Sequence, residues 1–168
     1  LIDATFVAKA DVEGWPALGP LARAVGTVFI DRSRKRDLLR VLPELHARLT
    51  AGESVVFFPE ATSSRGSEVL RFRSPLFEAP LRAGRPVVVA ALHYETRPGD
   101  PPASTDVCWW GDMEFAPHLW ALMRLRGITA TVELGAETLW EEDRKRLARR
   151  AHEATSKCFR SVDQGEIR

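Results

Sequence analysis

Residues 53–66 read ESVVFFPEATSSRG, an apolar run that leads directly into a proline, a glutamate and three hydroxyl side chains. The run Val55–Phe58 is typical of a strand that is buried on both faces of a sheet. The polar segment that follows holds more functional groups than a simple chain reversal needs. Because ligands of open α/β sheets bind beyond the carboxyl ends of the strands, residues 59–64 form the first candidate binding turn.

Working outward from this stretch, strand and helix patterns alternate along the chain. Strands are predicted at residues 5–9, 26–31, 53–58, 86–94, 107–112 and 128–135. Helices are predicted at residues 15–25, 34–51, 74–84, 115–125 and 140–159, with Ser74 as an N-cap and a kink or break at Pro43. This alternation predicts an α/β fold with a largely parallel sheet and helices on both of its faces.

The composition is that of an ordinary globular protein. The 168 residues are 45% hydrophobic and 28% charged, and 24 basic side chains against 23 acidic ones leave a net charge of +1. This balance gives no reason to expect nucleic acid as a partner. No apolar run approaches the roughly 20 residues that cross a bilayer, and no signal peptide is evident. Cys108 and Cys158 form no C-x-x-C pair, which favours a reducing compartment.

A second polar segment follows the strand predicted at residues 26–31. Asp31 and Arg32 come directly after this strand, and three further basic residues lie at positions 34–36. If the two strands were neighbours, Arg32 would face residues 60–64 across one crevice. Guanidinium groups beside hydroxyls and backbone N–H groups suit a phosphate or carboxylate. The alternatives are that residues 31–37 are a solvated helix start and that Glu60 forms a structural salt bridge.

Other kinds of site find little support. There is no G-x-S-x-G elbow, no Walker loop and no G-x-G-x-x-G after a strand, which argues against a serine hydrolase and a nucleotide-binding protein. The four histidines lack metal-ligand spacing, so no metal is expected. Tryptophans such as Trp109, Trp110 and Trp120 could line an acyl groove or a membrane-facing edge, but core packing is the favoured interpretation.

Taken together, the motifs resemble those of the 1-acyl-glycerol-3-phosphate acyltransferases, the PlsC-like glycerolipid acyltransferase family. The G-x-x-F-x-x-R block of this family is matched by Gly26, Phe29 and Arg32. Its F-P-E-G-T-x-S block is matched by residues 58–60, by Thr62 and by either Ser63 or Ser64. Phe72–Arg73 stands where many members have Phe-Lys, and RPVVVAALHY occupies the place of the apolar fourth block.

The resemblance implies transfer of an acyl group from acyl-CoA or acyl carrier protein to the hydroxyl of a lysolipid. Lysophosphatidate and lyso-ornithine lipid are the acceptors that it suggests, and the acyl donor is the only co-substrate, with no further cofactor. It also implies peripheral contact with a membrane, at the cytoplasmic face of the inner membrane. The residues expected to seat the acceptor's phosphate or other polar head are Gly26, Phe29, Arg32, Glu60, Ala61, Thr62, Ser63 and Arg73.

Three departures from the family pattern qualify this expectation. No histidine of the chain has an aspartate five positions later, so the catalytic His-x4-Asp motif is expected upstream of Leu1. Residues 1–168 would then be a single acyltransferase domain truncated at its N-terminus and inactive alone. The alternative is a non-catalytic α/β domain that binds an anion or lipid head. Ala61 replaces a glycine, and it would be strained if its φ were positive. Val89 replaces the usual proline of the fourth block.

Overall fold

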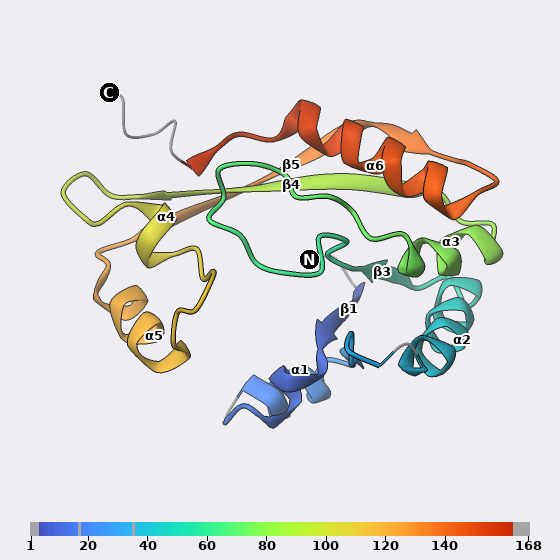
Figure 1. Cartoon of the computed structure of the whole chain (residues 1–168), viewed down its shortest axis with the longest axis horizontal. Coiled ribbons are helices and arrows are strands. Elements are labelled where there is room, and N and C mark those ends of the chain that lie inside the picture. The colour runs from blue at the N-terminus through green and yellow to red at the C-terminus, as the bar shows by residue number, and fades with distance from the viewer. Residues whose placement is uncertain (1–3, 17, 35, 163–168) are drawn as a thin grey trace. The chain divides into compact units, whose positions relative to one another are not determined.

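A computed structural model describes residues 4–16, 18–34 and 36–162 of the chain (Figure 1). Its residues fall into two compact units, which are considered separately. The first unit holds the described residues of segments 1–61, 73–87 and 140–148. The second unit holds those of segments 62–72, 88–139 and 149–168. The chain therefore leaves the first unit just after the FPEA segment and returns to it at Arg73.

The first unit is built on a parallel three-stranded sheet, as the alternation predicts. Its strands are β1 (Ala4–Lys9), β2 (Val28–Ile30) and β3 (Ser54–Val56), in the order β2-β1-β3. The two strands that carry the motifs are thus not neighbours, because β1 lies between them. Their carboxyl ends still point to the same edge of one sheet, since both strands run parallel to β1.

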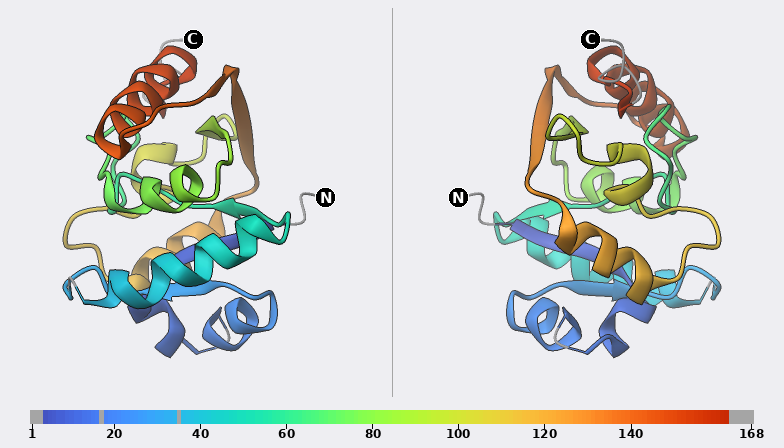
Figure 2. Two further views of the ribbon diagram at one scale, coloured as in Figure 1. Left: turned by 90° about the vertical axis from the view of Figure 1, so that its right-hand side faces the viewer. Right: turned by 90° about the vertical axis from the view of Figure 1, so that its left-hand side faces the viewer.

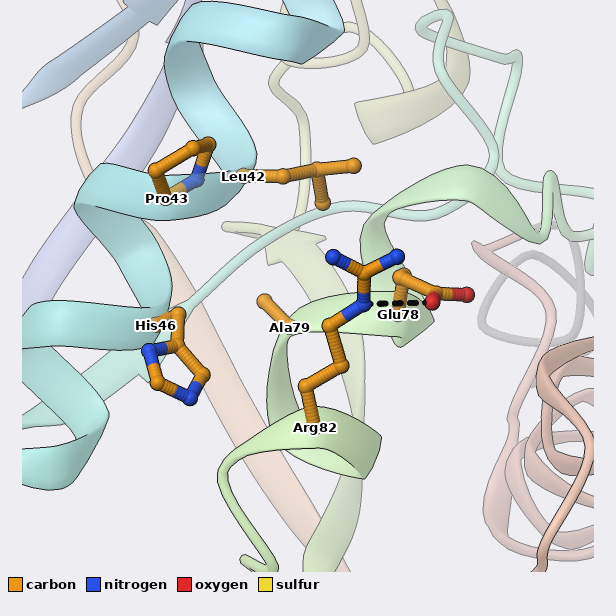
Figure 3. A pocket seen from close by; sticks show the side chains of 6 residues that line it. All are labelled: Leu42, Pro43, His46, Glu78, Ala79 and Arg82. Carbon is orange, nitrogen blue, oxygen red and sulfur yellow. Dashed lines mark hydrogen bonds and ion pairs between the residues drawn. The ribbon is translucent and has the colours of Figure 1, made fainter.

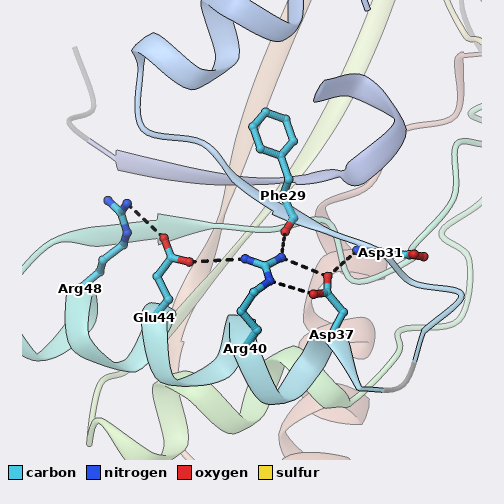
Figure 4. A network of polar contacts seen from close by, with 6 residues as sticks. All are labelled: Phe29, Asp31, Asp37, Arg40, Glu44 and Arg48. Carbon is cyan, nitrogen blue, oxygen red and sulfur yellow. Dashed lines mark hydrogen bonds and ion pairs between the residues drawn. The ribbon is translucent and has the colours of Figure 1, made fainter. Parts of the chain in front are cut away.

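Helices cover the sheet of the first unit. A short η1 helix (Ala10–Gly14) and α1 (Leu18–Ala24) connect β1 to β2, and α2 (Asp37–Thr50) connects β2 to β3. Val28 and Ile30 of β2 join the buried cluster that includes Val41 and Leu45 of α2. Side chains alternate along a strand, so Phe29 points to the opposite face, away from the helix that carries Arg40 (Figure 4). The ribbon views show α1 and α2 on different sides of this sheet (Figure 2). The expectation of helices on both faces is confirmed.

The helices of the first unit differ in detail from the prediction. Pro43 lies inside α2, so the break expected there does not occur, and a kink at Pro43 stays a prediction. Ser74 makes no side-chain capping bond, because it already has helical backbone angles, and residues 74–84 divide into a 3₁₀ turn, η2 (Pro75–Phe77), and α3 (Glu78–Arg82). The ring of Phe77 is buried and packs edge-to-face on Phe57, with the ring centroids 5.1 Å apart. This contact ties the segment after β3 to the core.

The second unit contains a two-stranded sheet of β4 (Val87–Thr96) and β5 (Ile128–Leu139). Along the chain, β4 is followed by α4 (Ala103–Asp106) and α5 (Phe115–Arg124) before β5 begins. The strand predicted at residues 107–112 does not form. The indole N–H of Trp109 donates to the carbonyl of Met113, and that of Trp110 to the carbonyl of Ser104, so side chains hold this segment in an irregular path. The last helix, α6 (Arg144–Cys158), begins in the first unit and ends in the second.

Candidate functional site

A tight turn follows β3 at Phe58–Ala61. The backbone N–H of Ala61 donates to the carbonyl of Phe58 at 3.2 Å, which places Pro59 and Glu60 at the two central positions. Proline suits the second position of a type I turn because its φ is already fixed near the required value, and glycine is favoured at the fourth. The F-P-E-G pattern of the resemblance is therefore first of all a turn sequence. Glu60 is half-buried at its apex.

Ala61 has a φ of +61° and is the one non-glycine residue with positive φ in the described part of the chain. The left-handed conformation brings Cβ close to the backbone, at a cost of about 1–2 kcal/mol per residue. The strain expected from the replacement of glycine by alanine is therefore present. Strain of this kind persists only where the surrounding structure imposes it, and it clusters at functional turns.

The turn is also fastened to Arg73, the basic residue expected after the motif. The backbone N–H of Arg73 donates to the carbonyl of Pro59 at 2.8 Å. Both residues belong to the first unit, whereas residues 62–72 belong to the second. The side chain of Arg73 is exposed. Arg73 therefore begins beside the turn and can extend a guanidinium from it.

Beyond β2, the chain is held by a network that starts from the first turn of α2 (Figure 4). The Asp37 carboxylate accepts the backbone N–H of Asp31 at 2.7 Å and the Nε–H of Arg40 at 2.8 Å. Arg40 also donates to the carbonyl of Phe29 at 2.6 Å. The hydrogen bond from Arg40 is the main reason that the pKa of Asp37 lies below its ordinary value. Reading the sequence alone did not find this network, although Asp37 and Arg40 have the i, i+3 spacing of an ion pair on a helix.

The carboxylate of Asp31 is likewise occupied. It accepts the hydroxyl of Ser33 at 2.6 Å and the backbone N–H of Ser33 at 3.0 Å, and it pairs with Arg34 at 3.1 Å. The hydroxyl bond is the largest cause of the lowered pKa of Asp31. These bonds form an Asx turn, in which the side chain of Asp31 closes a loop around residue 32. The backbone of Arg32 is therefore fixed by its neighbours.

Within the described residues, the side chain of Arg32 has no ion pair or hydrogen bond, because both adjacent carboxylates serve other groups. The side chain is exposed, although nearby protein atoms desolvate the guanidinium enough to lower the pKa of Arg32. The group stays cationic, since arginine does not lose its proton in proteins. Arg32 is thus a cation two positions beyond the end of β2, and its side chain has no partner in the part of the chain that the structure describes.

The fold itself explains why glycine and phenylalanine occupy positions 26 and 29 of the motif. Gly26, with φ +74°, ends α1 in a Schellman motif, in which Thr27 N–H donates to the Ala22 carbonyl and Gly26 N–H to the Arg23 carbonyl. Phe29 is buried, with 9% of its surface exposed. Of the three residues that match G-x-x-F-x-x-R, Arg32 is the one whose side chain is left for a ligand.

Thr62 and Ser63 follow the turn as exposed residues of the second unit. The hydroxyl of Thr62 donates weakly to the carbonyl of Ser63, at 3.4 Å, while Ser64 accepts the backbone N–H of Gly66 at 3.2 Å. Ser64 therefore has a local role in its own loop. The contribution of Thr62 and Ser63 to a binding site stays a prediction.

The registers of the sheet give the positions of the two motifs along its edge. β2 ends at Ile30, level with Lys9 of β1, whereas β3 ends at Val56, level with Phe6. Along β1, the end of β3 therefore lies three residues before the end of β2. Residues 57–59, which separate β3 from Glu60, are the same in number. Arg32 and the turn therefore both lie beyond the carboxyl edge of one sheet, on either side of β1. This edge is where α/β folds place their ligands.

A separate hollow of about 210 Å³ lies between α2 and α3 in the first unit (Figure 3). It is lined by Leu42, Pro43, His46, Glu78, Ala79 and Arg82. Its charged groups are already paired, because Arg82 donates to Glu78 at 2.7 Å and Arg144 approaches the same carboxylate at 3.4 Å. The hollow contains none of the motif residues and is not the candidate site.

The described residues contain no cluster of three or more His, Cys, Asp or Glu side chains that could hold a metal ion. Across the same residues, every helix is too short or too polar to span a bilayer.

Comparison with known proteins identifies the family. The family model described as "Acyltransferase" matches residues 3–93, which is more than half of the chain. The chain belongs to the acyltransferase family. The matched segment contains Arg32, the turn, Arg73 and β4 up to His93. The relationship inferred from the two motifs is confirmed.

Curated relatives of the chain include two kinds of lipid enzyme. A 1-acyl-sn-glycerol-3-phosphate acyltransferase of Neisseria gonorrhoeae is 32% identical over 152 residues, covering 89% of the chain and 58% of the relative. A lyso-ornithine lipid O-acyltransferase of Brucella abortus is 34% identical over 157 residues, covering 86% of the chain and 59% of the relative. The chain thus spans somewhat over half the length of these relatives.

One solved structure confirms the fold class. The 1-acyl-sn-glycerophosphate acyltransferase PlsC of Thermotoga maritima matches with a TM-score of 0.55 at 18% identity. The match covers 99% of the chain and 58% of the PlsC chain. The α/β fold with a parallel sheet and flanking helices is therefore shared with a lipid acyltransferase.

Proposed function

We propose that the protein to which this chain belongs transfers an acyl group from acyl-CoA or acyl carrier protein to the hydroxyl of a lysolipid. The acceptor is of the lysophosphatidate or lyso-ornithine lipid type. The chain's membership of the acyltransferase family and the names of its relatives support this class of reaction. The observation that carries the role of this chain is the side chain of Arg32, a cation without a partner among the described residues at the ligand-binding edge of the sheet.

In this proposal, Arg32 and Arg73 bind the anionic head of the acceptor. An arginine can donate two parallel N–H bonds to a phosphate or carboxylate, which fixes the orientation of the head as well as its affinity. Asp31 and Asp37 do not compete for Arg32, because each is saturated by other donors. Glu60 carries the same charge as the head, so we assign it to orienting nearby donors or to accepting from an acceptor hydroxyl. Gly26 and Phe29 position the strand that presents Arg32.

The reaction itself needs a base and a stabilised oxyanion. The acceptor oxygen attacks the thioester carbonyl, its proton passes to a base, a C–O bond forms, and the C–S bond breaks to release the carrier thiol. None of the four histidines here has an aspartate five positions later, so we assign no base to these residues. Their contribution is to hold the acceptor in a reactive orientation, an effect that can contribute several kcal/mol to catalysis.

A second candidate function follows from the same absence of a His-x4-Asp motif in these residues. The chain could be part of a non-catalytic domain that binds an anion or a lipid head through Arg32. Both functions predict binding of a lysolipid head, but only the first predicts turnover. The sequence encoded upstream of Leu1 separates them, because a His-x4-Asp motif there supports the enzyme.

The experiment that tests the proposal compares Arg32→Ala with Arg23→Ala in the full-length protein. Arg23 is an exposed arginine whose partner is the exposed Glu13, at 3.4 Å, so its removal is the matched loss of one charge. With acyl-CoA as the donor, we expect Arg32→Ala to raise KM for lysophosphatidate by the equivalent of about 2–3 kcal/mol. Arg23→Ala should leave it unchanged. Equal KM values for Arg32→Ala and the parent would remove Arg32 from the site.

A further inference from the structure

Residues 97–127 form an excursion between β4 and β5 that is closed at its base by one ion pair (Figure 1). Arg126 donates to the Asp100 carboxylate twice, from Nε at 2.6 Å and from its backbone N–H at 3.0 Å, and it also donates to the carbonyl of Pro98. Only 7% of the Asp100 side chain is exposed. The ion pair between Asp100 and Arg126 holds the two ends of the excursion together, and α5 lies between these residues in the sequence.

Helix α5 is predominantly apolar, with the sequence FAPHLWALMR, yet none of its ten residues is buried. Trp120 and Met123 are each 62% exposed and Leu119 is 37% exposed. A helix of a water-soluble domain normally turns such side chains into a core. The sequence-based preference for a core position is therefore wrong for Trp120.

The exposed apolar side chains share one face of α5. At about 100° per residue, Ala116, Leu119, Trp120 and Met123 fall within an arc of roughly 100°. The side opposite this face holds His118, whose Nε2 is buried, and at the flank of the helix the ring of Phe115 lies edge-to-face on Trp109 with the ring centroids 5.9 Å apart. Ala116, Leu119, Trp120 and Met123 are called the outer face of α5 below.

The charges around α5 are arranged asymmetrically. Arg124 is exposed at the border of the outer face, within about a quarter-turn of its centre. Glu114 precedes the helix and has an extended backbone, so it is not part of the outer face. The outer face therefore presents a tryptophan, a leucine and a methionine beside a cation and without a carboxylate. Tryptophan and long apolar side chains favour the boundary between head groups and acyl chains, and a neighbouring cation favours anionic lipid.

We propose that the outer face of α5 docks onto an anionic lipid bilayer, with Trp120 at the level of the head groups and Arg124 against lipid phosphates. The inference deepens the proposed function and rests on it, since a lysolipid acceptor is presented by a membrane. Tryptophan favours this interfacial depth because its ring is apolar and its N–H is polar.

The test measures binding of the 168-residue chain to vesicles and requires no turnover. Parent, Trp120→Ala and Trp140→Ala chains are sedimented with vesicles of phosphatidylcholine alone or mixed with phosphatidylglycerol. Trp140 is the matched control, because it is 53% exposed but lies outside α5. We expect the parent to bind the mixed vesicles, Trp120→Ala to bind about tenfold more weakly, and Trp140→Ala to bind like the parent. Removal of the cation in Arg124→Gln should weaken binding by about fivefold and reduce its dependence on salt.

The depth of Trp120 in the bilayer is tested with lipids that carry bromine on their acyl chains and quench tryptophan fluorescence. Quenching should be lost in Trp120→Phe and kept in Trp140→Phe. Thermal unfolding of each variant shows that the fold is intact. Failure of the parent to bind mixed vesicles, or equal binding by Trp120→Ala, would overturn the inference. So would a dimer of the parent that Trp120→Ala converts to a monomer, because the outer face would then be an interface between copies.

A separate assay distinguishes failure of this inference from failure of the proposed function. Full-length protein is supplied with a short-chain lysophosphatidate kept below its micelle concentration, so that no membrane is needed. Trp120→Ala should then retain the parent's activity, whereas Arg32→Ala should lose affinity for the acceptor. Vesicle binding without transfer to any lysolipid would contradict the proposed function and leave the docking surface supported.

Discussion

The backbone N–H of Arg73 and the carbonyl oxygen of Pro59 are joined by a 2.8 Å hydrogen bond. This bond connects two motif positions that are separated in the chain by a loop belonging to the other compact unit. The basic residue is therefore placed beside the turn by main-chain geometry and does not depend on the path of residues 62–72. Its side chain is exposed, and its contact with a ligand stays a prediction.

Because the tie uses only the backbone of Arg73, a change of its side chain should separate binding from stability. In the full-length protein, we expect Arg73→Ala to raise KM for the acceptor by the equivalent of about 1.5–3 kcal/mol, through loss of a charged hydrogen bond. The free energy of unfolding should change by no more than about 0.5 kcal/mol. Arg82→Ala, which removes an exposed arginine of α3, is the control for charge. Reduced stability with an unchanged KM would assign Arg73 to the fold alone.

The strain at Ala61 predicts a stabilising substitution. Ala61→Gly should raise the free energy of unfolding by about 0.5–1 kcal/mol, because glycine adopts φ of +61° without a steric penalty while its greater freedom in the unfolded chain offsets part of the gain. Urea denaturation measures the change. Ala51→Gly is the matched control, since Ala51 has a φ of −70°, and it should lose stability instead. A destabilised Ala61→Gly variant would show that the turn does not require positive φ.

Gly26 is expected to be a structural residue within a functional motif. Its φ of +74° ends α1, so Gly26→Ala should destabilise the protein by about 1 kcal/mol while KM for the acceptor stays the same. Gly14→Ala serves as the comparison, because a Cβ there meets no atom within 4 Å and its φ lies outside the left-handed region. A raised KM for Gly26→Ala at undiminished stability would instead mean that the acceptor contacts this glycine directly.

The network at Asp37 predicts a loss of stability in acid. Its hydrogen bonds lower the pKa of Asp37 below the ordinary value of 3.8, so the folded state favours the charged carboxylate. That stabilisation is complete above the unfolded pKa and is lost as the pH falls through the folded one, below 3.8. Asp37→Asn should therefore be less stable at neutral pH and should lose less stability between neutral pH and acid. Denaturation at a series of pH values measures both effects.

The partner of Asp37 gives an independent check. Arg40→Gln removes the group that contributes most to the lowered pKa of Asp37, so its acid profile should flatten in the same way. If Asp37→Asn and Arg40→Gln both keep the acid dependence of the parent, Asp31 or another carboxylate must dominate it.

Much of the fold follows from local pattern. The runs before Asp31 and Pro59 are apolar and bounded by turn residues, and β2 and β3 form within them. The expectation that Val55–Phe58 is a strand buried on both faces is wrong, because β3 ends at Val56 and Phe58 is 51% exposed. The positive φ of Ala61 could be anticipated, because a glycine is the residue expected at the fourth position of such a turn. Arg32 could be singled out because it directly follows a strand.

What the pattern did not reveal depends on contacts between distant residues. Nothing in the segments of β2 and β3 states that β1 lies between them, since strand order is set by how the connecting helices pack. The segment at residues 107–112 has strand-like composition, but the indole groups of Trp109 and Trp110 bond to carbonyls nearby and prevent pairing. The exposure of Trp120 depends on how α5 packs, with Phe115 against Trp109.

The central place of β1 has a consequence for selectivity. Two strand-to-strand steps separate the ends of β2 and β3, a width of about 10 Å, which is larger than a lone inorganic phosphate. In the proposed site, we expect an elongated polar group, such as a phosphate joined to a glycerol backbone or an amino-acid head with its linkage, to contact both motifs more readily than a lone phosphate does. Free phosphate should therefore compete poorly with the acceptor, because it is expected to contact only one of the two motifs at a time.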